Sequence, residues 1–472
     1  MDKIITLPRL LTLFFIASFY FFISTNGTFS YNLNQHTHYN TLADSFLNGK
    51  LALPYKVPEG LLALKNPYDP IANKPFRWGG FHDLSLYKEK FYLYFGPSAI
   101  VTAYIPFKLF TGKRLPDNLA IFIFTTGSLI LGSLIIFSLK KKYFQNIPEW
   151  IILLSICVFG FSNVSPFLLS SPYPYEVAIS SATFYLLGSI FFLMTALTKE
   201  NNNTKYFLLG GIFLGLVPGG RFYFTFACLI LILFLLKKTA APNIFNSLSN
   251  SQAKAIIISF FICLFLMFIY NYLRFGNFLE NGSKYLLTYF PPKLIDIQSV
   301  IPNSYSHIFQ PIVIKSNFPF IYTEYWKPYF VPGYLGEGAE KICGFIFSAP
   351  FVLFIFLIFL VNKNLKGLPF EFWLFLLPGG TNLILLLMFQ YVTMRYKADY
   401  LSLLILSACV AYFYYDSNFI GEKKARIITR FIFIFASIYS ILCGIAIGIN
   451  GHVLGLKDTN PLLFKKLEMF FN

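Results

Sequence analysis

The stretch Ala255–Tyr272, AIIISFFICLFLMFIYNY, contains no charged side chain. A helix needs about 20 predominantly apolar residues to cross the hydrocarbon core of a bilayer. Similar stretches recur along all 472 residues of the chain, of which 56% are hydrophobic and 12% are charged. Soluble domains carry about 25% charged residues. The composition therefore indicates an integral membrane protein.

Apolar stretches bounded by charge or turn residues define the predicted spans. We expect an all-α polytopic membrane protein with about eleven transmembrane helices. The stretch at 206–219 is short and rich in glycine, so we expect it to tilt, to break or to pack closely against the next helix. The predicted spans are 8–25, 117–138, 148–165, 177–197, 206–219, 222–236, 255–272, 345–361, 369–390, 398–414 and 429–449.

The basic residues occur in short clusters between the predicted spans, for example at Lys140-Lys141-Lys142 and Lys423-Lys424. With a cytoplasmic N-terminus, these clusters all fall on the cytoplasmic side, as the positive-inside rule requires. The net charge of +17 is explained by this placement and gives no reason to expect nucleic-acid binding. The segment 1–25 has no small-x-small cleavage site, so we interpret it as an uncleaved first span rather than a signal peptide.

This topology places two long segments outside the cytoplasm and divides the chain into six parts. The outer segments contain most of the candidate functional residues. The parts are the first helix at 1–25, an outer loop at 26–116, a transmembrane core at 117–272, a second outer loop at 273–344, C-terminal transmembrane helices at 345–449 and a tail at 450–472.

The apolar stretch Phe91–Phe110 is long enough to span, but counting it would invert every later loop. Pro97 suits a first helical turn and Gly112 suits a helix C-terminus. We therefore predict a juxtamembrane helix on the outer surface.

His36–Gly49, HTHYNTLADSFLNG, predicts a second surface helix, with Tyr39 in its apolar stripe and Asp44 on its polar face. Asp44 is either a functional carboxylate or part of an ordinary solvated face. The pair His36-x-His38 lacks the further ligands of a structural metal site, so we expect hydrogen-bonding or headgroup roles. The six cysteines show no metal-ligand spacing, and we expect no cysteine metal site and no disulfide framework.

A second candidate cluster is Arg77-Trp78-Gly79-Gly80-Phe81-His82-Asp83. Asp83 lies in an aromatic setting that could tune its pKa for general-base catalysis. The alternative is a turn-forming aspartate after two glycines.

Three arginines are predicted at the outer membrane face: Arg221, Arg274 and Arg395. Guanidinium groups match phosphate geometrically, so the three could converge on one phosphate or pyrophosphate. The alternative is that each arginine extends to the lipid headgroups independently. Glu176 opens a predicted helix on the same face, as a helix-dipole partner or as a site residue.

Several motifs together resemble membrane glycosyltransferases of the GT-C superfamily, near family 39. They are the first outer loop with Tyr39–Leu51, the segment Asp83–Pro97, and a surface helix ending Leu109–Gly112. Later matches are Tyr175–Ile179, Gly219–Phe222, Tyr270–Phe278 and Met394–Tyr400. The resemblance covers most of the chain through its layout and these short motifs.

The resemblance implies a GT-C-like fold in a bacterial inner (plasma) membrane. It implies transfer of a sugar from a polyprenyl-phosphate carrier to a lipid, glycan or protein acceptor on the outer face. Such enzymes usually invert the anomeric carbon, use an outer-loop carboxylate as general base and, in some members, a divalent metal ion. Arg395 corresponds best to the carrier-phosphate ligand. Tyr39, His82, Glu176, Arg221 and Arg274 are the further substrate-binding candidates.

The sequence departs from the family pattern just after the first helix. The family usually carries an acidic residue there, whereas this chain has Asn34-Gln35-His36. The general base would then be Asp83, which we prefer, or Asp44. Two other functions stay open, a transporter or flippase of a lipid-linked sugar and a non-catalytic envelope-assembly protein. Transporters place key polar groups near the bilayer midplane, whereas the charged groups here cluster at one face.

Overall fold

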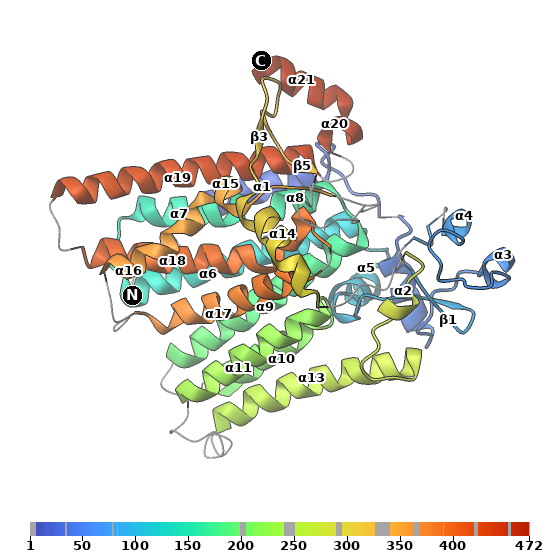
Figure 1. Ribbon diagram of the computed structural model, residues 1–472. Coiled ribbons are helices and arrows are strands. Elements are labelled where there is room, and N and C mark those ends of the chain that lie inside the picture. The colour runs from blue at the N-terminus through green and yellow to red at the C-terminus, as the bar shows by residue number, and fades with distance from the viewer. Residues whose placement is uncertain are drawn as a thin grey trace.

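The computed structural model is a bundle of long helices with a smaller loop-rich body at one end (Figure 1). The structure describes residues 6–33, 35–77, 80–82, 84–198, 204–239, 251–288, 295–325, 340–361, 368–389, 391–419, 423–451 and 455–471. Helices dominate these residues, so the expectation of an all-α membrane protein is confirmed.

Seven helices are long and apolar enough to cross a membrane, by length and composition, among the described residues. They are α1 (Leu7–Ser24), α6 (Asp117–Tyr143), α9 (Pro174–Thr198), α13 (Ser251–Phe275), α17 (Phe370–Leu387), the segment Met394–Ser417 with α18 (Ala398–Ser417), and α19 (Lys423–Asn450). Shorter apolar helices coincide with the other four predicted spans: α7 (Glu149–Ser162), α10 (Thr204–Leu216), α11 (Thr225–Thr239) and the run of η6 (Pro350–Leu357) and α16 (Ile358–Val361). The count of eleven spans stays a prediction.

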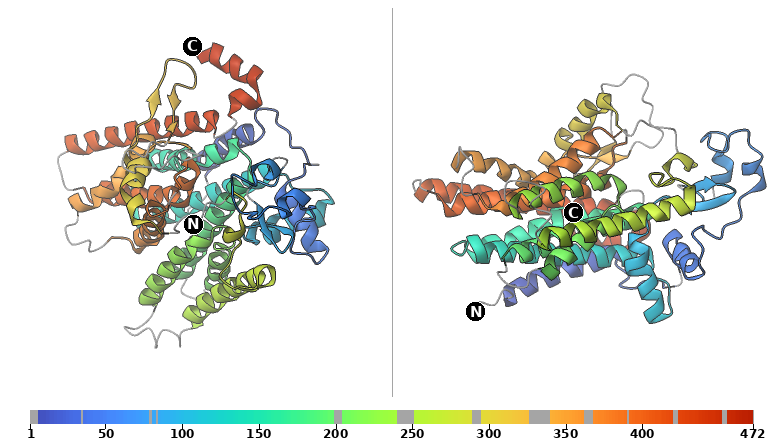
Figure 2. Two further views of the ribbon diagram at one scale, coloured as in Figure 1. Left: turned by 45° about the vertical axis from the view of Figure 1, so that its right-hand side comes forward. Right: turned by 90° about the horizontal axis from the view of Figure 1, so that it is seen from below.

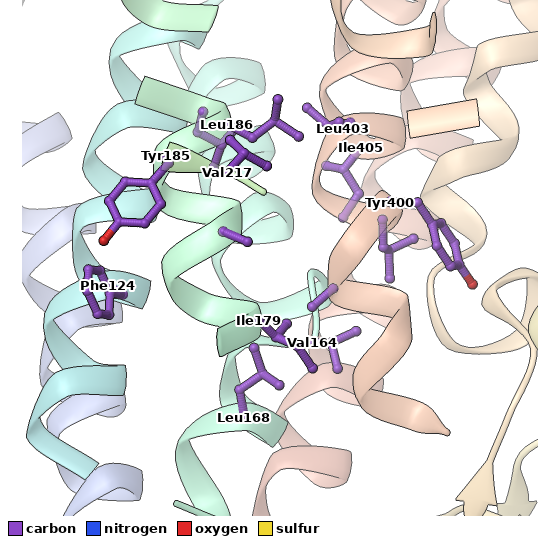
Figure 3. Close-up of a cluster of buried hydrophobic side chains, with 14 of the residues drawn as sticks. Phe124, Val164, Leu168, Ile179, Tyr185, Leu186, Val217, Tyr400, Leu403 and Ile405 are labelled. Atoms are coloured by element: carbon purple, nitrogen blue, oxygen red, sulfur yellow. The ribbon is translucent and has the colours of Figure 1, made fainter. Parts of the chain in front are cut away.

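The centre of the bundle is formed by α6, α9 and α18, which the other helices surround. Figure 3 shows Phe124 of α6, Ile179 and Leu186 of α9, and Leu403 and Ile405 of α18 among the buried side chains of this region. Helices at the periphery expose apolar side chains instead, as expected of a surface that contacts lipid. Examples are Phe14, Phe265, Leu360 and Phe435.

The glycine-rich helix α10 packs against α9 and α13. The Cβ that a side chain would add at Gly211 would lie 1.9 Å from Ser259 Oγ of α13. Close packing is therefore present against α13, and α11 also contacts α10, because Cys228 Sγ lies 3.8 Å from Leu214 O.

The bundle has two chemically different ends. At the lysine end, acidic side chains pair with neighbouring basic ones: Arg9 with Glu149, Lys142 with Glu371, and Asp416 with Arg426 and Arg430. The opposite end, which we call the loop end, holds the two long loops and the first turns of α6 and α9 (Figures 1 and 2).

The first long loop folds as a small body at the loop end. Its helices are α2 (His38–Leu47), α3 (Glu59–Leu62) and α4 (Lys74–Arg77), and its hairpin pairs β1 (Leu84–Tyr87) with β2 (Lys90–Leu93). Helix α2 matches the prediction for His36–Gly49, and it buries Tyr39, Leu42 and Ala43.

The predicted helix Phe91–Phe110 is wrong at its beginning, because Lys90–Leu93 is a strand. Phe91, Tyr92 and Leu93 pair with Leu84–Leu86, and all three side chains are buried. The helical part comprises η1 (Ile100–Tyr104) and α5 (Ile105–Thr111), and it ends at Gly112, whose φ is +70°. The predicted stop at Gly112 is confirmed.

The second long loop contains mostly short elements. They are η3 (Ser283–Tyr285), η4 (Ile297–Ser299), α14 (Val300–Ser304), η5 (Tyr305–Phe309), and two short antiparallel strand pairs, β3 (Val313–Ile314) with β4 (Ile321–Tyr322) and β5 (Glu324–Tyr325) with β6 (Lys341–Ile342). The C-terminal tail forms α20 (Leu456–Thr459) and α21 (Pro461–Phe471), and α21 packs Phe464 and Phe471 against Phe318 of this loop.

Candidate functional site

Three chain segments meet at the loop end, between the ends of the central helices. They are the start of α9, the turn after α10 that leads into η2 (Phe222–Phe224), and η7 (Met394–Lys397), which precedes α18. The first loop reaches the same place, because the Ser98 hydroxyl donates to Leu216 O at 2.7 Å. These segments carry two of the predicted arginines and Glu176.

Arg221 is buried and lies against Asp399, on the first turn of α18. Its Nη2 atom is 2.7 Å from Asp399 Oδ2 and 2.7 Å from the hydroxyl oxygen of Tyr223. The Tyr223 hydroxyl also donates to Asp399. The Asn382 amide donates to the backbone carbonyl of Asp399 at 2.9 Å, which fixes that turn. A buried ion pair needs such additional hydrogen bonds to offset the cost of removing both charges from water.

Arg395 forms a second buried group of charges beside the first. Its Nη2 atom is 2.7 Å from Glu340 Oε1, and its Nη1 atom is 3.6 Å from Glu176 Oε1. The guanidinium carbon lies 4.3 Å from the centre of the Tyr175 ring, a cation–π arrangement. Glu176 is fully buried, so it acts within this group of charges and not as a solvated helix cap.

Tyr396 connects the two groups. The guanidinium carbon of Arg221 lies 4.9 Å from the centre of the Tyr396 ring, and Arg395 is the preceding residue. The structure therefore brings Arg221, Arg395 and Glu176 together at the loop end. Two guanidinium groups and three carboxylates share this region, so a further anion must compete with carboxylates that already occupy the arginines.

Aromatic side chains of the first loop border the same region. The Phe95 ring lies edge-on to Tyr175 at 5.6 Å, and Tyr39 stacks on Phe95 at 6.4 Å and on Tyr104 at 5.2 Å. Tyr39 is almost fully buried, and burial raises the pKa of its hydroxyl well above the ordinary value. Tyr39, Phe95 and Tyr104 are buried against one another, so these rings join the first loop to the start of α9.

Arg274 occupies a different place from the other two arginines. Its guanidinium donates to Leu93 O at 2.7 Å and to Asn271 Oδ1 at 2.8 Å, and it lies over the Tyr270 ring at 3.9 Å. Arg274 thus connects the end of α13 to strand β2. This arrangement supports the hairpin rather than an open anion site.

Asp44 is held between two basic side chains of the next surface element. Lys108 Nζ contacts Asp44 Oδ1, and Arg114 Nη2 lies 2.8 Å from Asp44 Oδ2. Burial acts to raise the pKa of the Asp44 carboxyl, but the hydrogen bonds and charges of Lys108 and Arg114 outweigh it and lower the pKa. A carboxylate with a lowered pKa is a weaker general base. The geometry therefore favours a structural role for Asp44 in connecting α2 to α5.

Asp83, the preferred base, lies outside the residues that the structure describes. Its neighbours are described: His82 is exposed, and Leu84 begins strand β1.

Asp117 is a buried carboxylate that the sequence analysis did not single out. It begins α6 and accepts hydrogen bonds from the Tyr104 hydroxyl at 2.6 Å and the Thr37 hydroxyl at 2.8 Å. Thr37 in turn caps α2 by accepting from Asn40 N. Asp117 therefore joins both surface helices of the first loop to a transmembrane helix.

Sequence reasoning also missed Asp399, Tyr223 and Glu340 as partners of the arginines. Asp399 lies four residues after Arg395 in the motif Met394–Tyr400, and a carboxylate on the first turn of a span was a usable signal. Glu340 had no comparable signal, because its approach to Arg395 depends on the path of the second loop. In the described part of the chain, no three His, Cys, Asp or Glu side chains are grouped so that they could hold a metal ion.

Comparisons with known proteins give two similar solved structures. No model of a known protein family matches the sequence, and no curated protein matches it. An oligosaccharyltransferase of Archaeoglobus fulgidus in the apo form is similar with a TM-score of 0.49, 11% identity, and coverage of 93% of this chain and 56% of that chain. The archaeal oligosaccharyltransferase AglB of the same organism, in complex with an inhibitory peptide and a dolichol-phosphate, gives a TM-score of 0.46 at 11% identity, covering 94% of this chain and 56% of that one. The chain thus spans about half the length of these structures.

Proposed function

We propose that this protein is a membrane glycosyltransferase. It moves a sugar from a polyprenyl-phosphate carrier to an envelope lipid, glycan or protein acceptor, and its active site lies at the loop end. In the topology that we propose, the loop end faces away from the cytoplasm. The basic residues of the lysine end support this orientation through the positive-inside rule.

The observation that carries the proposal is the convergence of Arg221 and Arg395 on Tyr396. The two arginines come from distant parts of the sequence and meet at the end of a lipid-facing bundle. A carrier phosphate is attached to a membrane-embedded chain and arrives at this depth. Buried guanidinium groups are the side chains best suited to bind it, because their forked donors match its oxygens.

In the proposed reaction, the acceptor hydroxyl oxygen attacks the anomeric carbon from the side opposite the phosphate. The new carbon–oxygen bond forms as the bond from the anomeric carbon to the phosphate oxygen breaks, with inversion. The hydroxyl proton passes to the general base, and polyprenyl phosphate leaves as an anion. Arg395 and Arg221 stabilise the charge that develops on the leaving phosphate.

Asp83 is the general base in this proposal, with His82 beside it. The two ion pairs of Asp44 and its lowered pKa support Asp83 over Asp44. Tyr39, on the aromatic border, and Glu176, against Arg395, remain the proposed substrate-side groups of the site.

Glu340 is the group that the carrier phosphate would displace. It lies in the second loop, is partly exposed and holds Arg395 at 2.7 Å, whereas Glu176 is fully buried at 3.6 Å. Exchange of Glu340 for a phosphate keeps Arg395 neutralised throughout binding, so no bare charge is buried at any step.

The test is donor consumption by the purified protein in lipid vesicles, with wild type, Asp83→Asn and Arg395→Ala compared. Wild type should release polyprenyl phosphate and transfer the sugar to an acceptor-containing membrane extract. Asp83→Asn should bind the donor but transfer sugar at least 100-fold more slowly. Unchanged transfer by Asp83→Asn would remove this residue as the base. Movement of intact donor across the membrane of sealed vesicles would instead identify a transporter. The absence of both transfer and transport would favour a non-catalytic assembly protein.

A further inference from the structure

A basic hollow lies beside the end of helix α5, away from the paired arginines. It has a volume of about 510 Å³, and its walls combine the chain that follows α1 with the turn that follows α5. This volume falls in the range of small-molecule sites, about 300–1,000 Å³. The lining residues are Leu33, His36, Lys108, Gly112, Lys113 and Arg114.

The side chains of the hollow are held in place by one carboxylate. Asp44 binds both Lys108 and Arg114, and Arg114 Nη1 also lies 2.8 Å from His36 Nε2. Lys113 is exposed, and within the described part of the chain no carboxylate lies within ion-pair distance of its ammonium group. Three basic groups therefore face one acid, and the hollow keeps a positive charge that is not neutralised internally.

The hollow lies at the boundary of the membrane-crossing helices. Lys113 and Arg114 precede Asp117, the first residue of α6, by only a few positions. Next to them, Leu109 is 68% exposed and Phe110 is 89% exposed at the tip of α5. Large apolar side chains beside lysine and arginine characterise elements that lie in the headgroup region with their apolar part among the acyl chains.

We propose that this hollow binds the phosphate headgroup of an anionic phospholipid. The lysine and arginine side chains contact the phosphate, and Leu109 and Phe110 contact the acyl chains of the same lipid layer. The bound lipid fixes α5, and through Asp44 also α2, at the membrane surface. The occupant is a bulk bilayer lipid, and Arg395 of the proposed donor site is not among the residues that line the hollow.

The experiment is native mass spectrometry of the purified full-length protein, in which bound lipids are counted during a titration. The probes are phosphatidylglycerol, phosphatidylcholine, a polyprenyl phosphate and inorganic phosphate as a competitor. The variants are Lys113→Glu, which reverses the exposed charge in the hollow, and Lys65→Glu, which makes the same change at an exposed lysine of the first loop outside it. Arg395→Ala is included to separate the two sites.

Wild type should bind one phosphatidylglycerol more tightly than phosphatidylcholine. Lys113→Glu should weaken phosphatidylglycerol binding about 25-fold, because the reversal changes the charge by two and each charge near an anionic lipid contributes about five-fold. Lys65→Glu and Arg395→Ala should leave it unchanged. Equal phosphatidylglycerol binding by Lys113→Glu and wild type would overturn the proposal. Displacement of the lipid by millimolar inorganic phosphate would also overturn it. So would a Lys113→Glu variant that binds phosphatidylglycerol normally but no longer binds polyprenyl phosphate.

Discussion

Arg221 Nη2 lies 2.7 Å from Asp399 Oδ2, and 178 residues separate the two along the chain. Both side chains are buried at the loop end of the bundle. The pair ties the turn before α11 to the first turn of α18 and thereby sets the position of Arg395, four residues before Asp399.

Asp399→Asn should destabilise the folded protein strongly, because it leaves the Arg221 charge buried without its counter-ion. Breaking a buried pair in this way costs about 3–5 kcal/mol. Thermal unfolding in detergent measures the effect. The double variant Arg221→Met with Asp399→Leu should recover most of the loss, since it removes both charges together. A double variant no more stable than Asp399→Asn would contradict the assignment of the loss to an unpaired charge.

Arg274→Lys should lower stability without changing donor affinity. Lysine cannot reproduce the forked donation to Leu93 O and Asn271 Oδ1, so the hairpin loses an anchor to α13. The paired measurements are thermal unfolding and binding of a polyprenyl phosphate, with Arg395→Lys as the matched variant. Arg395→Lys should weaken binding about ten-fold or more. If Arg274→Lys weakens binding as much as Arg395→Lys, then all three arginines belong to the phosphate site.

Glu340→Gln should strengthen the binding of polyprenyl phosphate, because the amide no longer competes with the phosphate for Arg395. The matched variant is Glu324→Gln, at an exposed position in the same loop. Binding isotherms of both variants at equal ionic strength test this directly. Weaker binding by Glu340→Gln would mean that Glu340 supports the anion site instead of competing for it.

The stability of the protein should fall as the pH drops below about 6.5, partly through His307. Burial, together with the charge of Lys397, lowers the pKa of His307 to about 3. Since the unfolded chain binds the proton near pH 6.5 and the folded chain does not, this contribution is complete above pH 6.5 and decreases toward pH 3. At pH 5 the loss is about 2 kcal/mol relative to pH 7.

His307→Gln should show a shallower decline in unfolding temperature between pH 7 and pH 5 than wild type does. Glutamine keeps a donor and an acceptor for the Tyr400 hydroxyl, which lies 3.1 Å from His307 Nδ1, but carries no titrating group. Identical slopes for the two proteins would exclude His307 as a source of the acid sensitivity.

The sequence was sufficient for the helical membrane architecture, because apolar length and lysine placement are local properties of the chain. Gly112 likewise ends α5, as expected of a glycine at a helix C-terminus. The strand at Lys90–Leu93 could not be distinguished from a helix, since a short apolar run is compatible with either until its pairing partner is known. The packing of α10 on α13 could not be predicted either, because helix neighbours depend on the packing of the whole bundle.

Part of the candidate site could also be predicted from the sequence. Arg221, Arg395 and Glu176 could be placed at one membrane face from the ends of predicted spans. The separation of Arg274 from these residues could not be predicted. Arg274 donates to the backbone of a strand that the sequence had assigned to a helix. The neutralisation of Asp44 also depends on Lys108 and Arg114, which approach only when α5 folds back over α2.

The most direct test of the account is sugar transfer by Arg395→Ala alongside wild type in reconstituted vesicles. Labelled polyprenyl-phosphate sugar is supplied with an acceptor-containing membrane extract, and the released polyprenyl phosphate is quantified. We predict that wild type consumes the donor and that Arg395→Ala, still folded and inserted, consumes it at least 100-fold more slowly. Equal consumption by both proteins, or donor that crosses the bilayer intact with none consumed, would contradict a glycosyltransferase site built on Arg395.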